Sequence, residues 1–101
     1  MKYSISQQRL MEFIDSFLKG FLSKCAIYSP DSFILISQKV GDDDDSWVEY
    51  MEYDYSDGRL WVNKEFTKRF IDLFNFGIED TRYLIKQWFE KEFNVEVKFV
   101  E

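Results

Sequence analysis

Apolar residues in the first quarter of the chain recur at the spacing of an α-helix. Residues three and four positions apart lie on one helical face, and residues 4–24 follow this pattern. The apolar stripe consists of Leu10, Met11, Ile14, Phe17, Leu18, Phe21 and Leu22. The pattern therefore predicts an amphipathic helix that packs one face against a core.

The middle of the chain changes to patterns that are typical of β-strands. Residues 33–37 read FILIS, a continuous apolar run of strand length. Residues 46–55 alternate with a period of two, and the residues SDG at 56–58 predict a tight turn into a short strand at 59–62. In the alternating strand, one parity holds Trp47, Met51, Tyr53 and Tyr55, with Glu49 interrupting it, and the other holds Val48, Tyr50, Glu52 and Asp54.

The last third of the chain predicts two helices and one strand. Asn63 is a good N-cap for a helix over residues 64–75, and Gly77 suits a left-handed C-cap. Asp80 is the predicted cap of a helix over residues 81–93. Residues 95–100 alternate as a final strand with Val95, Val97 and Phe99 facing inward.

This order of elements, α-β-β-β-α-α-β, predicts an α+β fold. The natural arrangement is a three-stranded antiparallel meander with an N-terminal helix, two C-terminal helices and a final strand. The length of 101 residues predicts a single domain over residues 1–101.

Negative charge is concentrated in one segment of the chain. Residues 42–57 contain eight acids and no Lys or Arg, a formal charge of −8. The whole chain carries −6, so subtracting −8 leaves +2 for all other residues. The sequence therefore describes a nearly neutral body with one strongly acidic hairpin, which also holds aromatic residues.

We interpret this hairpin as a binding face for a basic protein. Charge accelerates the encounter with a basic partner, and aromatic side chains anchor the complex and stack on guanidinium groups. The predicted partner-binding residues are Asp42, Asp43, Asp44, Asp45, Trp47, Glu49, Tyr50, Glu52, Asp54 and Asp57. A nucleic-acid-binding protein is one such partner, because the hairpin then imitates a phosphate backbone. The simpler interpretation of the aspartate run, a solvated loop that aids solubility, stays open.

Several catalytic and metal-binding chemistries find no support in the sequence. Without histidine, the chain lacks the commonest general base and a common metal ligand. The aspartate run fails the EF-hand pattern because Trp47 stands where glycine is required, which leaves only a weak adventitious cation site open. The Glu96-Val97-Lys98 triplet resembles a nuclease E-x-K motif only at the level of chance, and Cys25 is a structural thiol. We therefore expect a non-enzymatic protein without cofactors or a metal.

The remaining expectations concern partners and location. A single cysteine, the absence of a signal-like start and the absence of a long apolar run predict a cytoplasmic protein that does not enter membranes. Direct binding of nucleic acid is disfavoured by the acidic hairpin. The composition is similar in character to virus-encoded inhibitors and immunity proteins. The alternative function is a structural or assembly subunit that self-associates or docks through Phe13, Phe76, Trp61 or an edge strand.

Overall fold

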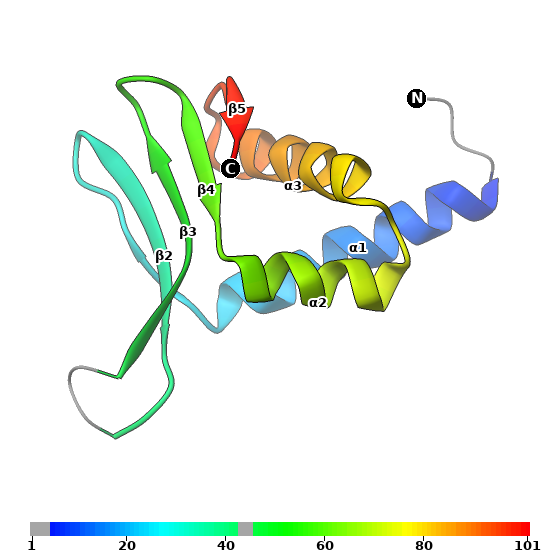
Figure 1. Ribbon diagram of the computed structural model, residues 1–101, viewed down its shortest axis with the longest axis horizontal. Helices are drawn as coiled ribbons and strands as arrows, with labels where there is room; N and C mark the ends of the chain where they lie inside the picture. The colour runs from blue at the N-terminus through cyan, green and yellow to red at the C-terminus, as the bar shows by residue number, and fades with distance from the viewer. Residues whose placement is uncertain (1–4, 43–45) are drawn as a thin grey trace.

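The computed structural model describes residues 5–42 and 46–101, and the side chains from residue 8 onward within that range. The elements are α1 (Ile5–Ser23), β1 (Ala26–Tyr28), β2 (Phe33–Lys39), β3 (Trp47–Asp54), β4 (Arg59–Val62), α2 (Lys64–Phe74), α3 (Ile78–Phe93) and β5 (Phe99–Val100). Figure 1 shows the three helices gathered on one side of the sheet. The predicted α+β class and the order of its main elements are confirmed.

The sheet has five strands in the order β1-β2-β3-β4-β5. The first four pair antiparallel, and β5 pairs parallel to β4. The meander prediction missed β1, whose three residues are all exposed and therefore carry no alternation. The final strand is also shorter than predicted. Phe99 points outward with 45% exposure, which contradicts its predicted inward position, because the pairing of Leu60 with Val100 places Val100 on the covered face.

The helix boundaries confirm one predicted cap and correct two others. The Asn63 side chain accepts hydrogen bonds from the backbone N–H groups of Glu65 and Phe66, as predicted. The left-handed residue that ends α2 is Asn75 and not Gly77, and α3 begins at Ile78, two residues before the predicted cap Asp80. Asp80 lies in the first turn of α3, where its charge still interacts favourably with the helix dipole.

A β-bulge interrupts the alternation of β3. Ile36 pairs with Met51 and the next residue, Ser37, pairs with Glu49, so Tyr50 is an extra residue in β3. A bulge of this kind exchanges the faces to which odd and even positions point. Before the bulge the even positions face the helices, and after it the odd positions Met51 and Tyr53 do so. The simple alternation predicted for residues 46–55 is therefore wrong at Tyr50.

The core lies between the helices and the covered face of the sheet. Edge-on and tilted ring contacts join the elements, such as Phe21 with Phe66 at 4.6 Å and Tyr53 with Phe89 at 5.6 Å between ring centroids. Most of the aromatic residues are buried in this core or pack against it. The buried hydrophobic residues are Ile14, Leu18, Ile34, Ile36, Met51, Tyr53, Leu60, Val62, Phe66, Phe70, Phe74, Leu84, Ile85, Trp88, Phe89 and Val97.

We predict that Asn63→Ala lowers the free energy of unfolding by about 1–2 kcal/mol, because Asn63 caps α2 and also ties it to the sheet. The variant loses the Nδ2 bond to the Glu49 carbonyl at 2.9 Å and keeps the backbone N–H bond to the Tyr50 carbonyl at 2.8 Å. Urea denaturation measures the change. Asn63→Asp keeps the capping oxygen and should lose less, so equal losses in both variants would contradict the capping role.

Candidate partner-binding face

The face of the sheet opposite the helices, here called the open face, collects acidic side chains from β3 and from the residue that follows β5. A shallow hollow of about 230 Å³ on this face is lined by Glu49, Glu52, Asp54, Arg59, Trp61 and Glu101. Glu49, Glu52 and Asp54 come from β3, Arg59 and Trp61 from β4, and Glu101 follows β5. Four carboxylates therefore surround one guanidinium group.

The bulge is the reason why three acids of β3 share this face. Glu52 and Asp54 follow the bulge at even positions, whereas Glu49 precedes it at an odd position. Without the extra residue, Glu49 would point to the same side as the buried Met51 and Tyr53. Burial of an unpaired carboxylate is costly, so the bulge brings Glu49 to the solvent-exposed side.

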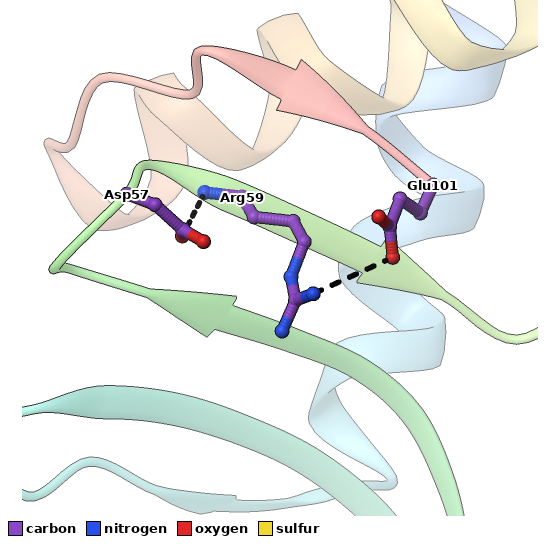
Figure 2. A network of polar contacts seen from close by, with 3 residues as sticks. All are labelled: Asp57, Arg59 and Glu101. Carbon is purple, nitrogen blue, oxygen red and sulfur yellow. Dashed lines mark hydrogen bonds and ion pairs between the residues drawn. The ribbon is translucent and has the colours of Figure 1, made fainter.

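Arg59 is the cation within the hollow, and it partly compensates the acids. Its guanidinium Nη1 lies 3.8 Å from the Glu101 carboxylate, and its backbone N–H donates to the Asp57 carboxylate at 3.0 Å (Figure 2). The Arg59 and Glu101 side chains are 43% and 51% exposed, and exposed ion pairs of this kind are weak. Arg59 is therefore available to exchange Glu101 for another partner.

Asp54 and Asp57 also organise the turn between β3 and β4. The Asp54 Oδ1 accepts hydrogen bonds from the Ser56 hydroxyl at 2.7 Å and the Ser56 N–H at 2.8 Å. These two bonds hold the pKa of Asp54 below its ordinary value, with a smaller contribution from the charge of Arg59. Gly58 adopts φ +71° at the turn, and a Cβ there would lie 2.7 Å from Lys98 Cγ, so glycine suits both the backbone conformation and the close approach of the chain before β5.

The predicted aromatic residues divide between the two faces. Trp47 is 47% exposed and lies on the open face opposite Lys39, and Trp61 lines the acidic hollow. Tyr50 lies on the other face, where its ring contacts Phe21 and Phe66 and its hydroxyl donates to Gln38 Oε1 at 3.2 Å. The structure therefore separates Tyr50 from the acids with which the sequence analysis grouped it.

Two further tyrosines of the hairpin differ in burial. Tyr53 is buried, and its hydroxyl donates to the Glu96 carbonyl at 2.6 Å. Burial is the largest cause that raises its pKa, followed by the nearby Tyr55 and acidic groups. Tyr55 remains 45% exposed at the turn and packs its ring edge-on against Tyr53. Of these two, only Tyr55 offers an accessible ring.

The aspartate run is only partly within the described chain. Asp42 is exposed in the loop that follows β2. Asp43, Asp44 and Asp45 lie outside the described residues. The acidic site that the structure describes is therefore the open face of the sheet.

The other candidates for metal binding or catalysis are also placed by the described residues. Among them, no group of three or more His, Cys, Asp or Glu side chains is placed to hold a metal ion. Glu96 and Lys98 lie in the segment before β5 and not on an inner strand. The Cys25 thiol donates to the Phe21 carbonyl, and partial burial raises the pKa of this thiol. In the same part of the chain, no helix combines the length and hydrophobicity of a membrane span.

Three residues of the hollow, Arg59, Trp61 and Glu101, are outside the predicted partner-binding set, and of these only Trp61 was predicted to dock, in the assembly alternative. Arg59 pairs with Asp54 and Trp61 with Glu52 in the β3–β4 register. The tight SDG turn is the signal that would have placed them beside the acids. The position of Glu101 depends on parallel pairing between distant segments, for which the sequence carries no local signal.

We predict that Ser56→Ala raises the pKa of Asp54 toward its ordinary value of 3.8, because the Ser56 hydroxyl bond is the largest cause of the lowered pKa. A carboxyl group with a lowered folded-state pKa stabilises the fold above its unfolded-state pKa, and this stabilisation is lost as pH falls through the folded-state pKa. Ser56→Ala should therefore be less stable than the parent at neutral pH, with a smaller difference in strong acid. Carboxyl-carbon NMR titration measures the pKa, and an unchanged value would contradict this assignment.

Comparisons with protein-family models, with curated proteins and with solved structures give no match for this chain. The open face itself therefore indicates the function. Its relevant features are the three β3 acids gathered by the bulge, the two exposed or half-buried tryptophans beside them, and the weakly paired Arg59.

Proposed function

We propose that this chain is a non-enzymatic interaction protein that binds a basic protein and regulates or inhibits it through the open face. The observation that carries the proposal is the bulge at Tyr50. It places Glu49 together with Glu52 and Asp54 on the side of the sheet that no described helix covers. The acids gathered in this way form a negatively charged surface, which suits the cations of a basic partner.

Two properties of the face suit it to Arg-rich and Lys-rich surfaces. The acids at Glu52 and Asp54 are two residues apart on one strand, about 6.7 Å along it, so they present regularly spaced negative charges. Trp61 pairs with Glu52 in register, which puts an indole ring beside a carboxylate. A guanidinium group stacks on such a ring while it donates hydrogen bonds to the carboxylate.

Each part of the face has a separate role in this proposal. The aspartates at positions 42–45 and the β3 acids attract the partner over a distance, which chiefly raises the association rate. The tryptophans supply the buried contact that slows dissociation. Since the acids imitate a line of phosphates, the phosphate-binding groove of a nucleic-acid-binding protein is the partner surface that fits best, and nucleic acid itself is repelled.

A second candidate function, that of an assembly subunit, is favoured by the other half of the same face. Tyr28 and Phe33 stack edge-on at 5.7 Å between ring centroids. Tyr28 is 61% exposed on the edge strand β1, whose three residues are all exposed. An exposed edge strand with apolar side chains can pair with another chain. The two functions differ in their dependence on salt.

We predict that the double variant Glu49→Gln, Glu52→Gln and the loop variant with Asp42–Asp45 changed to Asn each weaken partner binding. Affinity capture from native extract identifies basic proteins that the parent retains at low salt and releases at moderate salt. Binding of the purified partner is then measured by titration. Each variant should lose about tenfold or more in affinity, since each removes charges that a basic surface neutralises.

The matched control is Asp72→Asn, Glu92→Gln, which removes two exposed acids from α2 and α3, away from the open face. This variant should bind as the parent does. Equal weakening in the control would show that only net charge matters and would contradict a defined face. Full affinity in the Glu49, Glu52 variant would contradict the proposal directly.

We predict that the parent chain sediments as a monomer over a wide range of protein concentration at both low and high salt. Analytical ultracentrifugation makes this measurement. A salt-resistant oligomer would instead favour the assembly function and the β1 edge. The variant Tyr28→Lys, which places a charge on that edge, would then restore the monomer.

A further inference from the structure

A second surface, here called the cationic cleft, lies between α2, α3 and the ends of β4 and β5. Figure 1 shows both helices to the right of the sheet, with α3 above α2. It has a volume of about 470 Å³, which is within the usual range for small-molecule sites. Its lining residues are Trp61, Val62, Lys64, Thr67, Lys68, Ile71, Ile78, Arg82, Ile85, Val100 and Glu101. None of the predicted partner-binding residues is among them.

The walls of the cleft carry three cations. Lys64 and Lys68 come from α2 and Arg82 from α3, so positive charge stands on both sides. All three residues are exposed. Within residues 5–42 and 46–101, the ion pairs are Lys19 with Asp15 and Arg59 with Glu101. Lys39 also has an interaction partner. The three cations of the cleft therefore have no carboxylate partner among these residues.

The interior of the cleft is apolar. Ile71, Ile78 and Ile85 come from the two helices, and Ile78 keeps 42% of its surface exposed although it is a large aliphatic residue. The Thr67 hydroxyl already donates a hydrogen bond to the Asn63 carbonyl at 3.1 Å, within the first turn of α2. Glu101 is the single acid in the lining, and its carboxylate lies toward Arg59 at 3.8 Å (Figure 2).

The groove between α1 and α3 differs from the cationic cleft in its charges. That groove, of about 340 Å³, is also apolar at its base, but it is lined by Glu12 and Asp15 as well as Lys91. Its mixed charges favour neither an anionic nor a cationic ligand. In the cationic cleft, the three unpaired cations select an anion, and the isoleucines select an apolar body.

We propose that the cationic cleft binds a free amphipathic carboxylate with a medium-length acyl chain. The acyl chain lies on Ile71, Ile78 and Ile85, and the carboxylate lies between Lys68 of α2 and Arg82 of α3. The cleft volume of about 470 Å³ accommodates a chain of the length of octanoate. Apolar burial supplies most of the affinity, and the cations fix the orientation, favour the carboxylate over a neutral analogue and exclude a positive one.

The test is an NMR titration of the uniformly ¹⁵N-labelled chain with octanoate below its micelle concentration. Octanol, octylammonium and acetate serve as comparison ligands. Octanoate should shift backbone amides of residues 64–71 and 78–85, octanol should bind more weakly, and octylammonium and acetate should not bind. Lys68→Gln and Arg82→Gln should each weaken octanoate binding about threefold, as expected for exposed charges, and leave octanol binding unchanged.

The matched control is Lys86→Gln, which removes a cation from α3 that does not line the cleft. This variant should bind octanoate as the parent does. Equal affinity for octanoate and octanol, equal weakening in Lys86→Gln, or amide shifts confined to the groove between α1 and α3 would each overturn the proposal, as would the absence of shifts. The Glu49→Gln, Glu52→Gln variant should bind octanoate normally, so failure of this proposal leaves the open-face proposal standing.

Discussion

The extra residue in β3 is the constraint on which the rest of the structure depends. The bulge at Tyr50 exchanges the two faces of the strand, so that Tyr50 and Met51, although adjacent, both contribute to the helix-covered side. It also exposes the carbonyls of Glu49 and Tyr50 to the chain that leaves β4. Asn63 binds both carbonyls, and its side-chain oxygen starts α2. One irregularity thus sets the chemistry of the open face and the position of a helix.

The packing of the aromatic core follows from the same arrangement. The Tyr50 ring contacts Phe21 of α1 and Phe66 of α2, and these two phenylalanines contact each other. Aromatic contacts of this kind stabilise beyond the area that they bury. Because Phe66 lies three residues after Asn63, the capped start of α2 brings it within reach of Tyr50. The ring cluster therefore joins the sheet to two helices directly above the bulge.

Much of this fold could be predicted from sequence because its elements are periodic. The stripe of α1, the run FILIS and the cap Asn63 each have a local physical cause that the sequence displays. The bulge was missed, yet Glu49 in the apolar parity of β3 was its visible sign, since an acid in an otherwise inward row predicts a change of face. The β1 strand and the position of Glu101 were missed because tertiary strand pairing, not a local pattern, determines them. Gly77 was misassigned as a C-cap because Asn75 takes the left-handed position that ends α2.

The two proposed sites meet at Trp61 and Glu101, which line both the acidic hollow and the cationic cleft. The Glu101 carboxylate lies toward Arg59 in the structure, and in this position it leaves the cations of the cleft unopposed. A basic partner on the open face would compete with Arg59 for Glu101, whereas an anion in the cleft would repel it toward Arg59. Any coupling between the two proposed sites is reciprocal in binding free energy, so the geometry links the proposed partner-binding face and the proposed small-molecule cleft through a single carboxylate and a single indole ring.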